Sequence, residues 1–161
     1  MRRSSRGAGL VVVGLAIAAA AGCASETTVT KKAGSGDVVA DRQRLMKLNG
    51  GAWTEVQAKA KAGNMEGVAV SAETLALNAQ QIPAMFPAGS MTDKSKAKPE
   101  VWQKFPEFEA AAKKMEVESE KLRDAARAKN EQLVQDIVKD YGRVACGTCH
   151  TPFRVPPPRS S

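Results

Sequence analysis

The residues best suited to chemistry form the run Cys146-Gly147-Thr148-Cys149-His150, late in a chain of 161 residues. In a Cys-x-x-Cys-His run the two thiols can add to the vinyl groups of a porphyrin, and the adjacent histidine can reach the iron from the same side. On a helix, Cys146 and Cys149 lie one turn apart and His150 lies four residues after Cys146, so all three can face one porphyrin. The run therefore predicts one covalently bound haem c, with His150 as an axial iron ligand.

Three other interpretations of this run remain open. A redox dithiol usually follows a strand at a helix N-terminus, where the helix dipole lowers the pKa of the first thiol, and no strand pattern precedes Cys146. A zinc site needs four ligands, whereas the chain has three cysteines and one histidine. A disulfide between Cys146 and Cys149 would close a strained loop and leave His150 without a role. Haem attachment is the interpretation that uses all three residues.

The first residues have the pattern of an export signal. Three arginines precede an apolar run from Leu10 to Ala21, which is too short to span a bilayer and is followed by small residues. We interpret residues 1–22 as a signal peptide, whose end, Ala20-Ala21-Gly22-Cys23, resembles the bacterial lipoprotein box except that Ala20 stands where leucine is usual. We therefore expect Cys23 to be acylated.

Two fates of Cys23 are open. Acylation would make Cys23 the lipid-bearing N-terminus of the mature protein, whereas ordinary signal-peptidase cleavage would remove it or leave a free thiol. A lone exported cysteine at this place has few roles besides lipid attachment, so we favour the lipoprotein. Export agrees with the late cysteine pair, because covalent haem attachment in bacteria takes place outside the cytoplasm. We expect a periplasmic protein held at the membrane by lipidated Cys23.

Composition divides the rest of the chain into three parts. Residues 23–36 are rich in Ser, Thr, Lys and Gly and predict a flexible linker, residues 37–154 a single domain, and residues 155–161 a proline-rich tail. Loss of residues 1–22 removes three arginines and no acid, which lowers the formal net charge from +7 to +4. No basic patch is interleaved with aromatic residues, so we expect no nucleic acid partner.

Four stretches of the domain have apolar residues at helical spacing. They predict helices at about 38–62, 65–82, 99–126 and 130–149, joined by short turns and by one long aperiodic loop over 84–98. No stretch alternates with a period of two. The fold class we predict is all-α, an antiparallel four-helix bundle with haem c near the C-terminus.

Glycine and proline residues qualify these helices. Gly50-Gly51 weakens the middle of the first helix, where Gly50 could either give a porphyrin room or mark a simple bend. Pro106 should kink the third helix or divide off its first turn, and Pro152 should prevent the fourth from continuing.

Three segments carry a resemblance to a known family. They are Arg42-Gln43-x-x-Met46-Lys47, then Pro99-Glu100-Val101-Trp102 followed by Phe108, and finally Cys146-x-x-Cys149-His150-x-x-Phe153-Arg154. With them the chain resembles the class II c-type cytochromes, the cytochrome c′ family, from about Val39 to Arg154. The resemblance implies a haem inside the bundle, His150 as proximal ligand, the first helix over the distal face, and often a homodimer formed through the first two helices.

The resemblance also assigns a role to the residue four positions after Arg42. High-spin members of the family usually have an apolar side chain there and a five-coordinate iron, whereas Met46 resembles the low-spin branch with methionine as sixth ligand. Thioether sulfur favours ferrous iron, and His/Met ligation raises the reduction potential. We therefore expect Met46 to ligate the iron in an exported electron carrier. The alternative is a five-coordinate protein for nitric oxide or carbon monoxide, in which Met46 only shields the distal side.

The remaining expectations concern contacts of the haem and of the protein. Arg42 and Gln43 lie about one turn before Met46 and can approach the haem propionates, since arginine pairs with carboxylates in a bidentate manner. We expect redox protein partners in the periplasm or at the membrane. No catalytic constellation accompanies the haem motif, so we expect no enzymatic activity.

Overall fold

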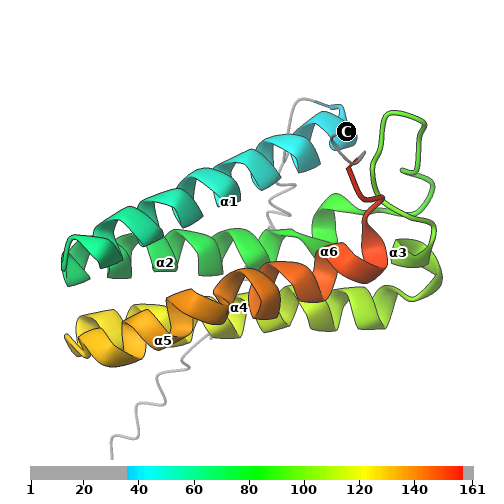
Figure 1. The fold of residues 1–161 in the computed structure, drawn as a ribbon. Coiled ribbons are helices and arrows are strands. Elements are labelled where there is room, and N and C mark those ends of the chain that lie inside the picture. The colour runs from blue at the N-terminus through cyan, green and yellow to red at the C-terminus, as the bar shows by residue number, and fades with distance from the viewer. Residues whose placement is uncertain (1–35, 158–161) are drawn as a thin grey trace, which may run out of the picture. The chain divides into compact units, whose positions relative to one another are not determined.

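The computed structural model describes residues 36–157 and shows a bundle of helices (Figure 1). The four long stretches of the bundle are α1 (Val38–Lys61), α2 (Met65–Gln81), α4 (Phe105–Arg127) and a fourth made of α5 (Glu131–Tyr141), η2 (Gly142–Gly147) and α6 (Thr148–Phe153). Two short elements, η1 (Pro83–Met85) and α3 (Glu100–Gln103), lie between α2 and α4. Within residues 36–157 there is no strand, only one isolated β-bridge, and the predicted all-α four-helix bundle is confirmed.

Some predictions fall outside these residues. The signal peptide at 1–22, Cys23, all of the linker but its last residue, and residues 158–161 of the tail are not among the residues that the structure describes. In the described part of the chain, no helix combines the length and the apolar composition that a bilayer crossing requires.

Side-chain caps begin three of the helices. The carboxylate of Asp37 accepts hydrogen bonds from the backbone N–H of Val39 at 2.9 Å and Ala40 at 3.1 Å, at the start of α1. Asn64 accepts from the N–H of Gly67 at the start of α2, and Asn130 accepts in the same way at the start of α5. Such caps satisfy N–H groups that have no partner inside a helix. Polar residues in the sequence therefore determine where the bundle turns.

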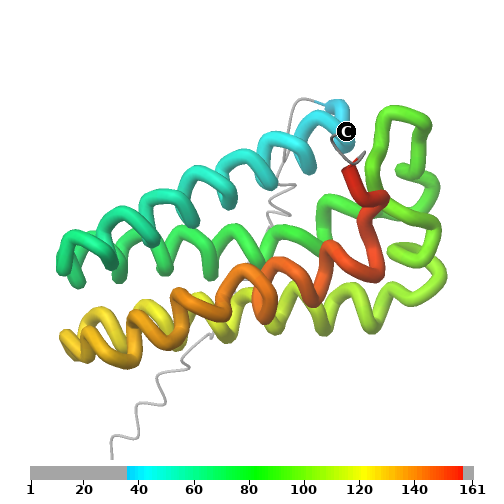
Figure 2. Tube along the Cα trace, viewed as in Figure 1, coloured from blue at the N-terminus to red at the C-terminus, as the bar shows by residue number. Residues whose placement is uncertain are grey.

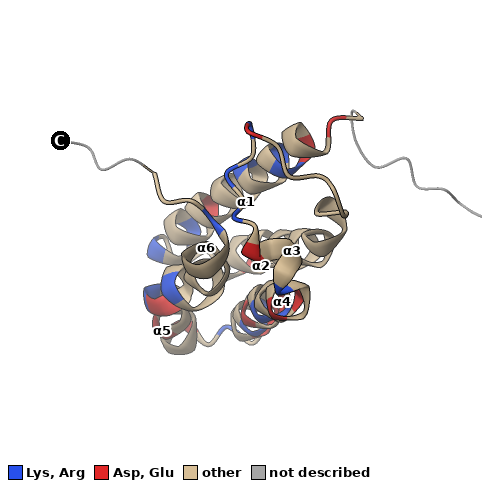
Figure 3. Ribbon diagram, turned by 90° about the vertical axis from the view of Figure 1, so that its right-hand side faces the viewer, with Lys and Arg blue, Asp and Glu red and all other residues tan. Residues whose placement is uncertain are grey.

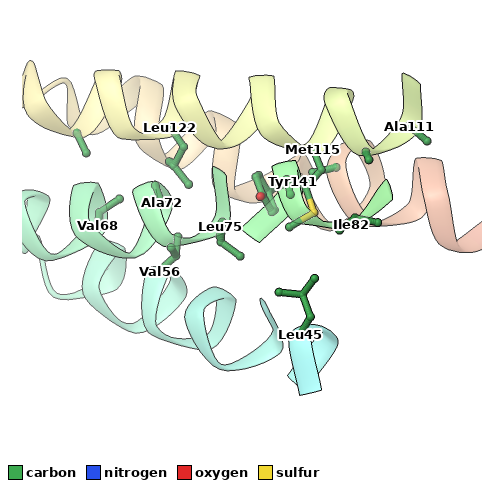
Figure 4. Packing of buried hydrophobic residues seen from close by; sticks show 14 of the residues in the cluster. Leu45, Val56, Val68, Ala72, Leu75, Ile82, Ala111, Met115, Leu122 and Tyr141 are labelled. Atoms are coloured by element: carbon green, nitrogen blue, oxygen red, sulfur yellow. The ribbon is translucent and has the colours of Figure 1, made fainter. Parts of the chain in front are cut away.

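Small residues determine how closely the central helices approach. The buried faces of α2 and α4 each carry four alanines, which lets the two helices pack along much of their length. Figure 4 shows Met115 and Leu122 of α4 pointing toward α2, with Tyr141 between them and the other helices. Tyr141 is fully buried, stacks on Trp53 with ring centroids 4.5 Å apart, and shares a 2.5 Å hydrogen bond with the Ser119 hydroxyl.

The two prolines behave differently. Pro106 lies in the first turn of α4, and a break at Lys104 separates α3 from α4, so the predicted division of the first turn is confirmed. Pro152 lies inside α6, which continues to Phe153, four residues past the predicted end of the fourth helix. Proline removes only its own N–H, and the N–H of Arg154 still donates to the carbonyl of His150 at 3.2 Å. The last turn therefore closes despite Pro152.

The glycine pair in α1 does not interrupt the helix. Gly50 and Gly51 are exposed and helical, and a Cβ atom added to either would meet no atom within 4 Å. Neither residue lines the cavity described below. We predict that Gly50→Ala and Gly51→Ala each raise the free energy of unfolding by about 0.5–1 kcal/mol, because alanine loses less backbone entropy in a helix. Urea titration of the holoprotein measures this, and a Gly50→Ala protein with lowered haem content would instead show that Gly50 makes room for the porphyrin.

Burial of Tyr141 predicts a loss of stability at alkaline pH. Desolvation raises the pKa of Tyr141 far above its ordinary value of about 10, although the bond to Ser119 opposes the rise. Below pH ~10 both folded and unfolded chains keep the phenol proton, and above it only the unfolded chain loses it. The free energy of unfolding should therefore fall by up to about 1.4 kcal/mol per pH unit above 10. The difference between wild type and Tyr141→Phe in urea titrations from pH 9 to 11 isolates this effect, and parallel curves would contradict it.

Candidate haem site

The fourth helix changes its winding just before the cysteine pair. From Gly142 to Gly147 it is a π-helix, and it returns to α-helix at Thr148. Short π segments are rare and occur often at functional sites, since the wider turn redirects the side chains that follow. Cys146 thus lies in the π segment, whereas Cys149 and His150 lie in α6.

A cavity of about 450 Å³ lies beside this motif, and volumes of about 300–1,000 Å³ are typical of cofactor sites. Figure 2 shows that the start of α1, the loop after α2 and the last described residues gather at one end of the bundle. Side chains from all three segments line the cavity. Its apolar lining comes from α1, α3, α4, α6 and the segments between α2 and α3, and includes Val39, Met46, Ile82, Phe86, Ala97, Val101, Phe108 and Phe153.

Most of the predicted site residues meet at this cavity. Arg42, Gln43 and Met46 of α1 line one side, and Cys149 and His150 of α6 line another. Cys146 is half-buried and packs against the hydrophobic core rather than lining the cavity. The structure thus brings the first helix and the Cys-x-x-Cys-His motif to opposite sides of one apolar space.

The thiols do not have the properties of a redox dithiol. Cys146 and Cys149 are both free, so no disulfide joins them. Burial raises the pKa of the Cys146 thiol, and burial together with the nearby Cys146 raises the pKa of Cys149 to about 11. A reactive dithiol needs the opposite shift, because the thiolate is the nucleophile. Nor does any group of three or more His, Cys, Asp or Glu within residues 36–157 come close enough to hold zinc.

His150 has the character of a neutral ligand. It lies at the cavity edge, and partial desolvation lowers its pKa, with the positive charge of Arg154 lowering it further. A lowered pKa keeps the imidazole neutral at neutral pH, so a ring nitrogen has a free lone pair for iron. His150 is the only histidine of the chain.

Arg42 is a charged residue in an apolar surrounding. It is only 5% exposed, and its guanidinium donates to the carbonyl of Ser90 at 2.7 Å and to the hydroxyl of Ser95 at 3.3 Å. It also lies over the rings of Phe86 and Trp102, 4.5 and 5.7 Å from their centroids. Burial lowers the pKa of Arg42, which the carboxylate of Asp37 partly opposes.

One N–H group of Arg42 is left over. Its Nε is buried and has no hydrogen-bond partner, although buried donors are nearly always paired. A haem propionate beside Arg42 would supply the missing acceptor and a compensating charge. Together with the apolar cavity, the two free thiols and the neutral imidazole, this unsatisfied donor shows that the residues present fit a haem c.

Residues of the loop after α2 form part of the site that the sequence did not indicate. Ala97 forms an antiparallel bridge with Arg154, and the N–H of Lys98 donates to the carbonyl of Phe153 at 2.9 Å. These contacts bring Ser95 and Lys96 to the cavity. The loop has no periodicity, and its partner lies more than 50 residues away, so no local signal in the sequence marks this pairing.

The fold and the site define a four-helix-bundle haem protein. It binds one haem c per chain through Cys146 and Cys149. The comparisons with known proteins specify the family.

The sequence matches the family described as "Cytochrome C'" over residues 37–154. Cytochrome c-556 of Agrobacterium tumefaciens (strain B2A) is 32% identical over 121 residues, which cover 73% of this chain and 96% of that protein. The cytochrome c′ of Rubrivivax gelatinosus has a similar structure, with a TM-score of 0.64, 25% identity, and coverage of 74% of this chain and 96% of that one. A nitric oxide complex of a leucine-to-alanine variant of cytochrome c′ from Alcaligenes xylosoxidans has a TM-score of 0.67, 22% identity, and coverage of 76% and 96%. This chain belongs to the cytochrome c′ family.

Family membership corrects one prediction from the sequence. The expectation of an electron carrier with a low-spin haem ligated by His150 and Met46 is wrong, because the chain belongs to the cytochrome c′ family, which favours the five-coordinate alternative. The position of Met46 has a simpler physical cause. Met46 is half-buried and packs against the core, where a flexible thioether fills irregular space.

The contacts of Arg42 predict that it stabilises the loop after α2. Arg42→Ala removes two hydrogen bonds and two ring contacts, so we expect the free energy of unfolding to fall by about 2–3 kcal/mol and amide exchange in residues 87–98 to accelerate. The control is Arg44→Ala, which removes an exposed arginine paired with Asp41 and should cost less than about 1 kcal/mol. Urea titration and hydrogen exchange of the two holoproteins measure both effects. Equal losses in the two variants would show that Arg42 does not hold the loop.

Proposed function

We propose that this protein binds nitric oxide or carbon monoxide at a five-coordinate haem. The observation that carries the proposal is that one cavity is lined both by the one histidine of the chain and by apolar side chains of α1, Val39 and Met46. A haem whose iron has one axial protein ligand supplies an open coordination position for a diatomic gas. The family to which the chain belongs supports the same function.

The residues of the cavity have separate roles in this proposal. Cys146 and Cys149 hold the porphyrin covalently, and His150 supplies the proximal ligand. Val39 and Met46 cover the distal side, where an apolar wall excludes water and charged ligands because neither could recover its lost hydration there. Transfer of a neutral diatomic molecule into the cavity costs little free energy, because such a molecule has little hydration to lose. The site therefore selects ligands by charge before it selects them by size.

Charged residues hold the outer edge of the porphyrin. Arg42 pairs with a propionate through the N–H group that the protein leaves unsatisfied. Gln43, the next residue of α1, also lines the cavity and is exposed, so its amide can donate to the same edge. Arg154 lies beside His150 and keeps the imidazole neutral.

The setting of the protein follows from its sequence. We place it in the periplasm, attached to the membrane by lipidated Cys23, with a redox protein as partner and no enzymatic activity of its own. A homodimer is also part of the proposal. Leu48 of α1 and Val70 and Leu77 of α2 are exposed apolar residues that a second copy could cover, and one cytochrome c′ of similar fold has a ligand-controlled dimer dissociation.

The distal cover predicts an effect of Met46 on gas entry. The wild-type protein should have high-spin absorption bands and bind carbon monoxide when reduced, and Met46→Ala should raise the association rate about tenfold or more, since a side chain that must move aside adds at least about 1.4 kcal/mol to the barrier. Met85→Ala is the matched control, because Met85 is also half-buried and packs on the core but does not line the cavity. Flash photolysis of the carbon monoxide complex measures the rates. Low-spin bands and no binding of carbon monoxide by wild type would overturn the proposed function.

A further inference from the structure

Three exposed basic side chains surround the opening of the haem cavity. Lys47 comes from α1, Lys96 from the loop after α2, and Arg154 from the residue after α6. We call these three residues the basic collar. No aspartate or glutamate lines the cavity. Because the collar combines three distant segments, no basic run in the sequence marks it.

About half of the other basic residues between 36 and 157 form ion pairs with carboxylates, and the collar residues are among those that do not. Elsewhere on the described surface, cations such as Arg44 and Lys114 form ion pairs with nearby carboxylates. No carboxylate of residues 36–157 lies within 4 Å of the charged nitrogens of Lys47, Lys96 or Arg154. Their positive charge is therefore available to a partner.

The negative charge of the haem does not neutralise the positive charge of the basic collar. One propionate has the buried Arg42 as its counter-charge, so at most one further negative charge remains for three exposed cations. Figure 3 looks onto this end of the bundle and shows Lys and Arg on α1 and near α6, together with acidic residues on α1, in the loop and near α3. The carboxylate of Asp37 is close enough to Arg42 to raise its pKa, against the lowering by burial. The opening keeps an excess of positive charge.

We propose that the basic collar is the docking surface for an acidic protein that donates one electron to the haem. This inference rests on the proposed function, because carbon monoxide binds only to ferrous iron and exported haem proteins meet oxidising surroundings. In the step, the donor protein is oxidised by one electron and the iron is reduced from ferric to ferrous, with no bond formed or broken.

The arrangement of the collar favours a protein over a membrane as the occupant. The three cations line a cavity, and Figure 3 shows acidic residues at the same end of the bundle. A flat anionic bilayer would meet these acids together with the collar. A protein that presents carboxylates around its own redox centre can contact the collar alone, which also brings the two redox groups close together.

The test measures reduction of the ferric holoprotein by two donors in stopped-flow or flash experiments. One donor is reduced flavodoxin, an acidic one-electron donor protein, and the other is photoreduced lumiflavin, which is neutral. We take the ratio of the reduction rate with flavodoxin to the reduction rate with lumiflavin. A change in the haem itself alters both rates, whereas a change in docking alters only the rate with flavodoxin. In wild type the ratio should fall about tenfold or more between about 10 and 300 mM ionic strength, because electrostatic steering is screened by salt. Lys47→Glu/Lys96→Glu should lower the ratio about tenfold at low salt and flatten its salt dependence.

The control reverses two charges at the opposite end of the bundle. Lys61→Glu/Lys129→Glu changes net charge by the same amount, at the last residue of α1 and in the turn after α4, and should leave the ratio within about twofold of wild type. An equal fall in the control would show that only net charge matters and would overturn the docking surface. Cosedimentation with phosphatidylglycerol vesicles that depends on Lys47 and Lys96, with an unchanged flavodoxin ratio, would assign the collar to a membrane and overturn the protein partner. If flavodoxin reduces the wild-type protein with the expected salt dependence but the reduced protein does not bind carbon monoxide, the proposed function is refuted and the docking surface is not.

Discussion

An apolar cavity of about 450 Å³ is the constraint on which the rest of this structure depends. Protein interiors are otherwise close-packed, and water gives an empty apolar space little compensation for the contacts it lacks, so an apolar group inside it stabilises the bundle. The bundle meets this constraint by being closed at one end and open at the other. Alanine-rich faces hold α2 against α4, while α1 diverges from α2 toward its own N-terminus, where the haem cavity lies (Figure 1).

Aromatic residues and one cation support the open end. Phe108 lies 4.7 Å from the ring of Phe86 and 5.4 Å from that of Phe153, so one ring cluster joins α4 to the loop after α2 and to the end of α6. The buried guanidinium of Arg42 adds α1 to this cluster by its ring contacts and by its bonds to the loop. A buried cation costs free energy unless it is paired, and this one keeps an N–H group unsatisfied. Without haem, the site therefore lacks one hydrogen-bond acceptor, which a haem propionate would supply.

The parts of the structure that could be predicted from sequence are those that depend on local chemistry. Pro106 marks the division of the third helix, and Cys146 to His150 mark a haem attachment, and each follows from the properties of the residues themselves. The pairing of Ala97 with Arg154 and the π segment before the cysteines could not be predicted, because each depends on contacts across the fold. For Met46, the residue type alone did not decide the role. The residue type allowed both packing and iron ligation, and only the family of the whole chain decided between them.

The inner wall and the opening of the cavity differ in charge, so the site can bind two kinds of partner. The inner wall, which includes Val39 and Phe86, is apolar and admits neutral molecules, whereas the opening carries the unpaired charges of the basic collar. A gas crosses the collar without interacting with it, since it has no charge, and an acidic protein is held at the collar because its carboxylates cannot enter an apolar cavity without losing their hydration. Electron donation and gas binding can therefore occur at one haem without competition, as long as the charges stay at the opening and the distal wall stays apolar.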